Sequence, residues 1–468
     1  MRVYNTMTRK KEELIPLEKG VLKIYACGPT VYNYIHIGNA RPICVCDVLR
    51  RYLEYTGLTV KFIQNFTDID DKIINKANEE NSDYLTVSKK FIEEYIKDST
   101  GLNIRKATIH PKATENIDEM IDIIKTLVEK GFAYKTENND VYFRTKNFKD
   151  YGKLSHQPLE DLEVGARISV GEIKEDPMDF VVWKSAKPGE PYWDSPWGNG
   201  RPGWHIECSA MARRYLGKTI DIHYGGQDLI FPHHENEIAQ SECSSGVEFA
   251  RYWMHNGYIN IDNKKMSKSL NNFFTVRDVA NKYGYEPIRY LMISSHYRSP
   301  INYSEDVIKQ CIAALDRLYT CRNNLDFLLK NTNNQTNSID NSIKEKFLEH
   351  KAAFITAMED DLNTADALSA LFDLVRDINS NVNIESSKET INFAIDLFDE
   401  LSGILGLVYN RKNENVDSKI EDLINQREAA RKSKDWALAD KIRDELKSQG
   451  ITLEDTKSGV KAVFHKEP

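Results

Sequence analysis

Short apolar runs and helical periods alternate in the first 64 residues of the chain. Residues 21–26 form a β-rich apolar run that fits a buried strand. A helical period follows and places five apolar residues on one face before Gly57 ends it: Val45, Val48, Leu49, Tyr52 and Leu53. Residues 58–64 are a second β-like run. Strand, helix and strand in this order predict a βαβ unit, with parallel strands and a ligand crevice at their carboxyl ends.

The α/β pattern is interrupted and then resumes. Amphipathic helices are predicted over residues 84–96 and 116–129. From residue 133 to residue 197, short strands, charged turns and prolines predict a β-rich insertion. The α/β pattern resumes with a helix over 203–215, a strand over 219–223, a glycine turn and a helix over 232–243 that holds Pro232 in its first turn.

The rest of the chain is predicted to be mainly helical. A bundle extends from about residue 306 to residue 407, and a polar linker precedes two further helices, over 420–433 and 436–449, and a β-like tail. The predicted fold class is α/β: a Rossmann-like parallel-sheet domain with a β-rich insertion, then an α-helical bundle, then a small C-terminal mixed α/β domain. We place the segments at residues 1–132, 133–200, 201–250, 251–305, 306–408, 409–418 and 419–468.

Composition places the chain among ordinary globular proteins. Its 468 residues are 41% hydrophobic and 29% charged, a length that predicts two to four domains. The net charge of −8 means that a polyanion would have to bind a local basic surface. No signal peptide and no apolar run long enough to span a membrane is present, so we expect a cytoplasmic protein without membrane contact. Seven cysteines without regular spacing indicate reduced thiols that are available as ligands.

Four side chains form a candidate metal site. His233 and Glu237 are four residues apart on a predicted helix and therefore share one face. Adding Cys27 and Cys208, which the topology brings to the same strand ends, gives sulfur, nitrogen and oxygen donors that suit Zn²⁺. The alternative is that both cysteines are buried apolar residues and that His233 only caps a helix.

Two lysines and a helix start form a candidate phosphate site. His36-Ile37-Gly38-Asn39 follows a strand and opens a helix, where free backbone N–H groups favour phosphate. The alternative is that Asn39 is the N-cap residue and His36 a loop side chain. Lys265 and Lys268, in Lys-Met-Ser-Lys-Ser, put two ammonium groups on one loop that could clamp a pyrophosphate, although a solvated loop is the other interpretation. Neither GxxxxGK[ST] nor GxGxxG occurs.

The joint pattern resembles a known class of enzymes. HIGN and KMSKS occur in this order around an α/β core with an insertion, as in class I aminoacyl-tRNA synthetases. Long matches narrow the resemblance to the cysteinyl-tRNA synthetase family, and they lie at residues 26–32 (ACGPTVY), 65–72 (NFTDIDDK), 203–209 (GWHIECS) and 231–237 (FPHHENE). The resemblance extends to residues 434–440 (KDWALAD) and so covers essentially the whole chain.

The resemblance implies a reaction. The family ligates L-cysteine to its tRNA in an ATP-dependent reaction that passes through cysteinyl-adenylate, with Mg²⁺ accompanying ATP. One Zn²⁺ per chain would be held by the residues Cys27, Cys208, His233 and Glu237, and the substrate thiolate would join it. Soft metal–thiolate bonding favours cysteine over serine, so no editing domain is expected. The implied partners are tRNA for cysteine, L-cysteine and ATP, and the enzyme would act as a monomer.

The family's functional residues map onto this sequence. The positions around the amino acid are Gly28, Thr67, Trp204 and His234. Those that bind ATP are Gly38, Gly226, Asp228 and Lys268. Catalysis would rest on His36, Asn39, Lys265 and Lys268. Two positions depart from the pattern, because Asn39 replaces the usual last histidine of the HIGH motif and Tyr224 replaces a glycine.

The tail carries the predicted tRNA contacts. By resemblance, residues 251–305 form the KMSKS loop and stem-contact region, residues 306–408 a tRNA-binding bundle and residues 419–468 an anticodon-reading domain. The candidate tRNA-binding residues are Arg427, Arg431, Trp436, Asp440 and Asp455. Arginine forks and aromatic faces suit splayed bases, whereas the alternative places Trp436 in a core and the charges on solvated helices.

Three other functions compete with this one. A cysteine ligase could transfer cysteine to an amino sugar, but such relatives lack the anticodon-reading tail that this chain has. A synthetase-derived RNA-binding regulator would not need intact HIGN and KMSKS motifs. A zinc hydrolase would need an open metal position for water, whereas four protein ligands leave none.

Overall fold

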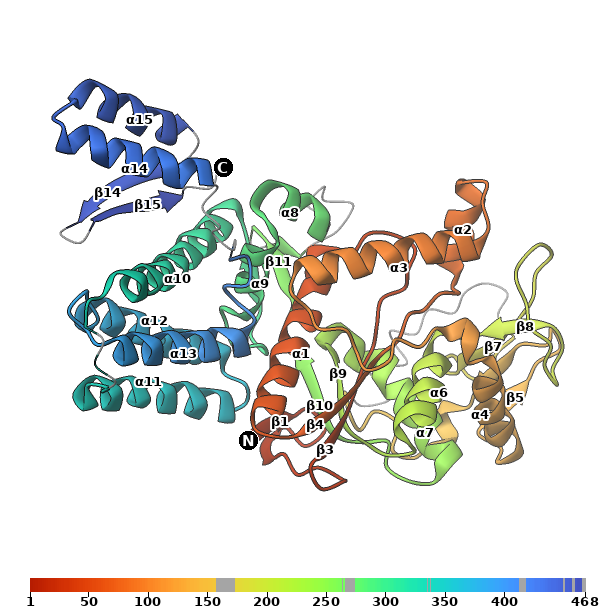
Figure 1. Cartoon of the computed structure of the whole chain (residues 1–468). Helices are drawn as coiled ribbons and strands as arrows, with labels where there is room; N and C mark the ends of the chain where they lie inside the picture. Colours follow the sequence, from red (N-terminus) through yellow and green to blue (C-terminus); the bar gives the residue numbers. More distant parts are fainter. Residues whose placement is uncertain are drawn as a thin grey trace.

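A parallel four-stranded sheet lies at the centre of the N-terminal part of the chain, residues 1–304 (Figure 1). The computed structural model describes residues 1–156, 173–262, 264–265, 274–334, 336, 338–411, 418–448, 451–456 and 459–464. The strand order is β10 (Ala250–Asn256), β9 (Ile220–Gly226), β3 (Val21–Ala26) and β4 (Thr59–Gln64). All three pairings are parallel. The βαβ pattern predicted the parallel strands β3 and β4, whereas β10 was not predicted.

Helix α1 (Ile37–Tyr55) makes the crossover from β3 to β4. All five residues of its predicted apolar face are buried. Gly57, with φ of +91°, takes the left-handed conformation just beyond the helix end. The predicted βαβ unit is therefore confirmed.

The helices between β4 and the insertion are more numerous than predicted. Both predicted helices are present, as α3 (Tyr84–Gly101) and α4 (Ile117–Glu129). The prediction did not include α2 (Asp71–Glu79), which begins after the N-cap Asp70. It also did not include the hairpin of β1 (Arg2–Asn5) and β2 (Lys10–Glu13), a pair of strands too short and polar to give a clear apolar period.

The insertion beginning at Ala133 is confirmed as a separate antiparallel sheet. Its strands, in order, are β5 (Ala133–Lys135), β6 (Val141–Phe143), β7 (Phe180–Ser185) and β8 (Gly200–Pro202). Trp183, a residue of β7, is fully buried.

The α/β pattern resumes with α6 (Trp204–Leu216), as predicted. The helix expected from Pro232 is wrong at its start, because α7 (Glu235–Ser245) begins three residues later. The preceding turn, Ile230–His234, is irregular, and Phe231 has an extended backbone inside it (φ −134°, ψ 135°). His233 therefore belongs to this turn and Glu237 to the helix.

The chain after β10 leads into a second layer of small elements. A three-stranded sheet has the order β12 (Lys264–Lys265), β11 (Ile259–Ile261) and β13 (Ile301–Tyr303). Helices α8 (Val276–Tyr283) and α9 (Tyr285–Ile293) follow the lysine loop.

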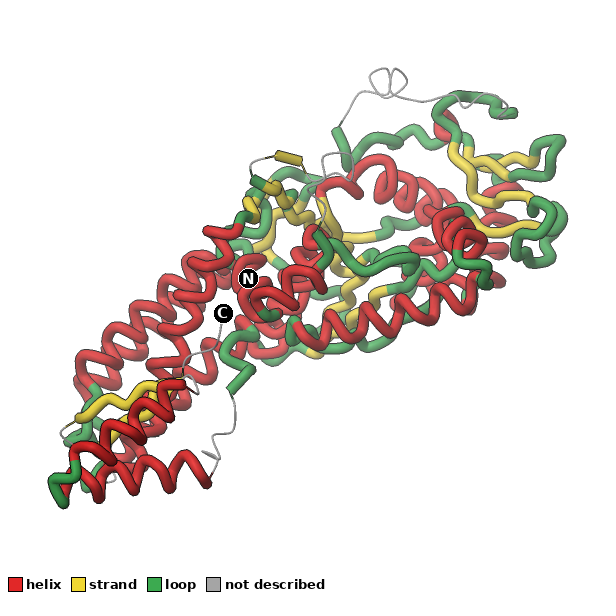
Figure 2. The backbone as a smooth tube through the Cα atoms, turned by 90° about the horizontal axis from the view of Figure 1, so that it is seen from above, coloured by secondary structure: helices red, strands yellow, loops and turns green. Residues whose placement is uncertain are grey.

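The predicted bundle and C-terminal domain are both present. The bundle consists of α10 (Glu305–Asn331), α11 (Asn341–Glu359), α12 (Thr364–Asn381) and α13 (Lys388–Leu405). The C-terminal domain pairs α14 (Ser418–Lys432) and α15 (Trp436–Ser448) with the hairpin of β14 (Ile451–Thr456) and β15 (Gly459–Phe464). Figure 2 shows the helices of the bundle and of the C-terminal domain at one end of the molecule and the strands of the insertion at the other. Among the described helices, none has the length and apolarity needed to cross a bilayer.

A buried ion pair joins the end of the bundle to α1 and α9. The guanidinium of Arg289 on α9 is fully buried and donates to Asp47 Oδ2 of α1 at 2.6 Å and to the Leu405 carbonyl at the end of α13 at 2.9 Å. Gly406 follows with φ of +67°, and a Cβ there would lie 2.2 Å from the guanidinium. Three helices from distant parts of the sequence are thus fixed around one arginine.

Candidate active site and metal centre

The four predicted metal ligands converge at the carboxyl edge of the parallel sheet. Cys27 directly follows β3, Cys208 lies in the second turn of α6, His233 in the irregular turn and Glu237 in the first turn of α7. Cys27 Sγ lies 3.6 Å from Cys208 Sγ, 3.5 Å from His233 Nε2 and 3.3 Å from Glu237 Oε1. All four donor atoms lie within 4.8 Å of one another.

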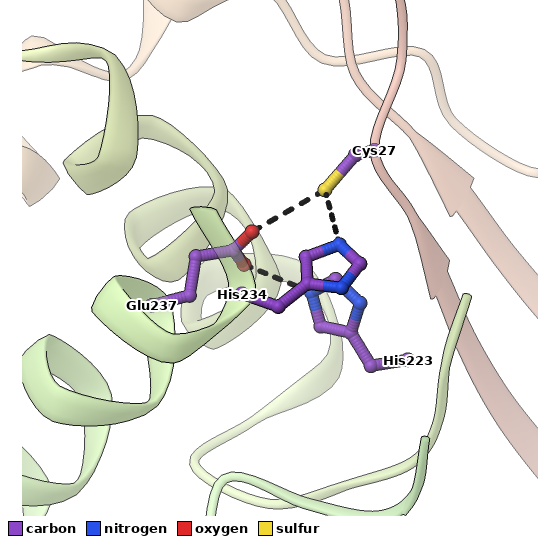
Figure 3. Close-up of side chains that lie close together, drawn as sticks. All are labelled: Cys27, His223, His234 and Glu237. Carbon is purple, nitrogen blue, oxygen red and sulfur yellow. Dashed lines mark hydrogen bonds and ion pairs between the residues drawn. The ribbon is translucent and has the colours of Figure 1, made fainter. Parts of the chain in front are cut away.

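A second set of four donors shares two of these residues. His223 and His234 join Cys27 and Glu237, again with all donor atoms within 4.8 Å (Figure 3). His223 Nε2 lies 2.8 Å from Glu237 Oε2, and His234 Nε2 lies 3.5 Å from Cys27 Sγ. The other nitrogen of His234 bonds to His255 Nε2 at 2.8 Å. This site offers one sulfur donor instead of two.

The predicted set suits Zn²⁺ better than the second set. Two thiols, one imidazole and one carboxylate are donors that zinc accepts in tetrahedral sites. In this arrangement His223 and His234 hold the ligands from outside, His223 through the second oxygen of Glu237. Hydrogen bonds of this kind orient metal ligands and tune their basicity. The residues present therefore fit the ion that the donor chemistry predicts.

The cluster lowers the pKa of two of its ligands and raises the pKa of the other two. Burial would lower the pKa of His233, but Glu237 and Cys208 raise it to about 10. Burial would raise the pKa of Glu237, but His223 and His233 lower it to about 2. A hydrogen bond from Cys27, partly opposed by burial, lowers the pKa of the Cys208 thiol to about 6. Burial, followed by Cys208, raises the pKa of Cys27. Since a metal binds thiolate and carboxylate, Cys208 and Glu237 are prepared for it.

The predicted amino-acid residues surround this cluster. Trp204 opens α6, is 41% exposed and covers the His233 ring at a centroid distance of 4.1 Å, so it is not a core residue. Gly28 lies against the backbone of Asn65, where a Cβ would meet the carbonyl oxygen at 1.6 Å. Thr67 is buried and donates its hydroxyl to Glu207 Oε2 at 2.6 Å.

Three residues at the site were not predicted. Asn65 Oδ1 accepts from the Gly28 N–H at 2.9 Å, Glu207 accepts from Thr67, and His205 Nδ1 lies 3.0 Å from His233 Nδ1. Asn65 and Glu207 stand inside the motifs that carried the resemblance, immediately beside functional positions. Their polar type within otherwise apolar elements was the available signal.

The HIGN residues form the start of α1. His36, not Asn39, is the N-cap residue, so the alternative that made Asn39 the cap is wrong. The Asn39 side chain instead accepts from the His36 N–H at 3.1 Å. Burial, with a smaller contribution from Lys72, lowers the pKa of His36 to about 4. The imidazole is therefore neutral near pH 7. Gly38 lies in the first turn, where backbone N–H groups are free of intrahelical partners.

Backbone hydrogen bonds bring the chain that leaves the lysine loop to the HIGN segment. Ile37 N–H donates to the Phe274 carbonyl at 3.0 Å, and Val276 N–H donates to the Ile35 carbonyl at 2.9 Å. Lys265 lies in β12, while Lys268 lies outside the described residues. The HIGN segment and residues 274–276 are thus anchored to each other, although they lie more than 200 residues apart in sequence.

The nucleotide turn lies at the end of β9. Gly226 closes the strand, and a Cβ there would lie 2.3 Å from Asp228 Oδ1. Asp228 is exposed in the following 3₁₀ turn, Gln227–Leu229, and so is accessible to a ligand. Tyr224, which replaces a glycine of the family pattern, is fully buried inside β9.

The predicted tRNA residues differ in exposure. Trp436 begins α15 and is 58% exposed, so it is not a core residue. Asp440 is exposed and pairs with Arg443 at 3.0 Å. Arg431 is half-buried, whereas Arg427 is only 6% exposed. Asp455 lies in β14, and its side chain is outside the described atoms.

Sequence comparisons place the fold and site within one class of enzymes. The family described as tRNA synthetases class I (C) catalytic domain matches residues 13–313. A DALR domain matches residues 353–409, and a cysteinyl-tRNA ligase anticodon binding domain matches residues 414–461. The parallel sheet with its HIGN helix start is thus that of a class I tRNA synthetase.

Two curated relatives narrow the class. The cysteine–tRNA ligase of Caldicellulosiruptor saccharolyticus is 56% identical over 463 residues, covering 98% of this chain and 99% of that protein. The cysteine–tRNA ligase of Clostridioides difficile is 55% identical over 468 residues, with the same coverage. The chain belongs to the cysteine–tRNA ligase family.

Solved structures confirm the fold. Mycobacterium tuberculosis methionyl-tRNA synthetase in complex with methionyl-adenylate matches with a TM-score of 0.63 at 14% identity, over 82% of this chain and 91% of that one. A ternary complex of Agrobacterium radiobacter K84 LeuRS matches with a TM-score of 0.59 at 11% identity, over 85% and 86%.

The burial of His36 predicts its titration. Its pKa falls from the usual 6.5 to about 4, so between these values the unfolded chain binds a proton that the folded chain does not. The contribution of His36 to the free energy of unfolding therefore rises with pH across this window and is constant above it. NMR titration of ¹⁵N-histidine-labelled protein should show His36 neutral from pH 8 down to about pH 5, with the signal assigned by its loss in His36→Asn. A midpoint near 6.5 would contradict the burial argument.

Proposed function

We propose that this chain ligates L-cysteine to its tRNA through cysteinyl-adenylate. The observation that carries the proposal is the convergence of Cys27, Cys208, His233 and Glu237 beside Trp204, at the same sheet edge where α1 begins with HIGN. A thiol-binding centre and a phosphate-binding helix start thus lie at the two ends of one loop, residues 27–36. The near full-length relatives named as cysteine–tRNA ligases support this assignment.

One Zn²⁺ fits the predicted ligands. When bound, it would supply a soft Lewis acid that prefers the thiolate of cysteine to the hydroxyl of serine. The chain would contribute a second level of selection through Trp204, whose exposed ring covers His233, and through Gly28, which packs against the Asn65 backbone. Selection at this level removes the need for editing.

The first step joins cysteine to AMP. The cysteine carboxylate attacks the α-phosphorus of ATP, a carboxylate–phosphorus bond forms, and the bond to the β-phosphate oxygen breaks to release pyrophosphate with its Mg²⁺. We assign His36 as a neutral hydrogen-bond donor to the phosphoryl oxygens, Asn39 as a support of its position, and Lys265 and Lys268 as the charges that stabilise pyrophosphate. Asp228 would bind the ribose hydroxyls, and Gly38 and Gly226 let the nucleotide approach the backbone.

The second step transfers the cysteinyl group. A hydroxyl of the terminal adenosine of tRNA attacks the carbonyl carbon of the adenylate, and AMP leaves. No covalent bond to the enzyme is required. All the proposed residues come from one chain, so the active site is complete in a monomer.

We assign tRNA reading to the bundle and the C-terminal domain. The exposed indole of Trp436 offers a stacking surface for an unpaired base, with Arg431 and Asp440 nearby on the same helix pair. Arg427 and Asp455 complete the candidate set. This domain distinguishes the proposal from a ligase that uses an amino-sugar acceptor.

Loss of one thiol ligand should impair metal binding while the chain still folds. Cys208→Ser is expected to lower zinc affinity by more than about a hundredfold, since disturbing only the outer partners of a metal site already costs that much. Cysteine-dependent ATP–pyrophosphate exchange should fall with it. Cys243→Ser is the matched control, because Cys243 is also buried and free but lies outside the cluster. Full zinc occupancy and unchanged exchange in Cys208→Ser would refute the metal assignment.

Removal of the C-terminal domain should separate the two steps. A chain ending at Arg411 keeps the bundle anchor, in which Val408 N–H donates to Glu286 Oε1 at 2.6 Å. It is expected to retain cysteine-dependent exchange while its kcat/KM for tRNA charging falls at least about tenfold, the loss expected from one stacked base. Charging at the full-length rate would overturn the assignment of this domain.

A further inference from the structure

Glu207 is a buried carboxyl group without a cationic partner. Its side chain is 1% exposed, and its one hydrogen-bond donor among the described side chains is the hydroxyl of Thr67, at 2.6 Å. Two other buried carboxylates have arginine partners: Asp47 pairs with Arg289 at 2.6 Å, and Asp361 with Arg298 at 2.8 Å. The buried carboxylates that lack a cation among the described residues, such as Asp179, Asp221 and Glu235, accept from backbone N–H groups of that part of the chain, which Glu207 does not. No lysine, arginine or histidine of the described residues forms an ion pair with Glu207. Because burying a carboxylate without a cation is costly, this position calls for an explanation.

The position of Glu207 places it at the amino-acid pocket. Trp204, Glu207 and Cys208 are spaced i, i+3 and i+4 on α6 and therefore share one face of the helix. That face presents the wall of the pocket, the unpaired carboxyl group and a metal ligand together.

Thr67 connects this carboxyl group to the opposite side of the pocket. It is 1% exposed and follows β4 at the carboxyl edge of the sheet. Asn65 Nδ2 lies 3.5 Å from Thr67 Oγ1, and Asn65 Oδ1 holds the Gly28 N–H at 2.9 Å. A line of hydrogen bonds thus passes from Glu207 through Thr67 and Asn65 to Gly28, the neighbour of Cys27.

We propose that Glu207 is a positioning residue that makes Thr67 the acceptor for the α-ammonium group of cysteine. The hydroxyl proton of Thr67 is committed to Glu207 and one lone pair of its oxygen accepts from Asn65, so toward the ligand the oxygen offers its remaining lone pair and no proton. An ammonium group donates to such an oxygen and brings the cation that the buried carboxyl group lacks. The inference rests on the proposed function, because it takes cysteine as the amino acid.

The same geometry explains how the amino acid is oriented. The thiol is bound at the cluster beside Cys208, and the ammonium is drawn toward Thr67 and Glu207. These two anchors leave the third substituent of the α-carbon, the carboxylate, free to face the HIGN end of the loop. Glu207 thereby helps to select the stereoisomer of cysteine and to direct its carboxylate toward ATP.

Three small thiols test this role. L-cysteine has both an ammonium and a carboxylate, cysteamine lacks the carboxylate, and 3-mercaptopropionate lacks the ammonium. Their dissociation constants for the zinc-loaded full-length protein would be measured by calorimetry in the parent and in Glu207→Gln, which keeps the size of the side chain but removes its charge. Zinc content, measured in parallel, must be equal in both proteins.

Loss of a charge-assisted contact predicts a selective effect. Glu207→Gln should weaken L-cysteine and cysteamine by about ten- to hundredfold, the range for a hydrogen bond to a charged group. It should change 3-mercaptopropionate less than about threefold. Equal weakening of all three thiols would show that Glu207 only shapes the pocket, and an unchanged affinity for all three would show that it has no role; either result overturns the proposal.

Two further variants sharpen the test. Asp68→Asn is the matched control, because Asp68 adjoins Thr67 and is also a buried carboxyl group, but it bonds to Thr114. If it penalises the two ammonium ligands as much as Glu207→Gln, a general negative field is responsible and the Thr67 contact is refuted. When Glu207→Gln is added to a Thr67→Val variant, the dissociation constant of cysteine should rise by less than about threefold further, since the two residues act as one unit. If the parent protein binds none of the thiols, the proposed function itself fails and this inference falls with it.

Discussion

The carboxylate of Glu237 is fully buried, and its compensation by two imidazoles is the constraint on which the rest of the site depends. His223 lies 2.8 Å from one oxygen and His233 3.0 Å from the other. Removing one partner of such a buried pair costs about 3–5 kcal/mol, so β9, the turn before α7 and α7 itself must keep their relative positions. Cys27 and Cys208 approach the same carboxylate from β3 and α6. The site is therefore a polar core in which the Glu237 carboxylate is held by two imidazoles. A divalent cation would bind this carboxylate and the two nearby thiols.

A second buried and compensated charge connects α1 to the bundle. Arg289 is buried between Asp47 of α1 and the carbonyl of Leu405 at the end of α13. Helix α1 begins at the HIGN segment, so one continuous helix extends from that segment to the base of the bundle. Backbone hydrogen bonds between Ile35–Ile37 and Phe274–Val276 fasten the lysine-loop segment to the same helix start. The parts proposed to hold tRNA and ATP are therefore connected through α1.

The sequence predicted the frame of this protein better than its contacts. The apolar runs predicted the parallel strands β3 and β4 and helix α1 because burial on both faces leaves a continuous apolar signal. The start of α7 was misplaced because Phe231 adopts an extended conformation that no local pattern announces. The convergence of Cys27, Cys208, His233 and Glu237 could be predicted because the α/β topology brings their segments to the same strand ends, although no one of these residues is informative alone. Asn65 and Glu207 could not, because a polar residue in a buried element reveals its role only through the partner that tertiary packing supplies, here Gly28 and Thr67.

The central claim is that the cluster of Cys27, Cys208, His233 and Glu237 holds a metal that recognises the thiol of cysteine. The most direct measurement is the absorption spectrum of the cobalt-substituted protein, whose thiolate-to-metal charge-transfer band reports the sulfur atoms bound to the ion. The band should intensify when L-cysteine is added and stay unchanged with L-serine at the same concentration. A spectrum that does not respond to L-cysteine, under conditions in which the amino acid binds, would contradict the account.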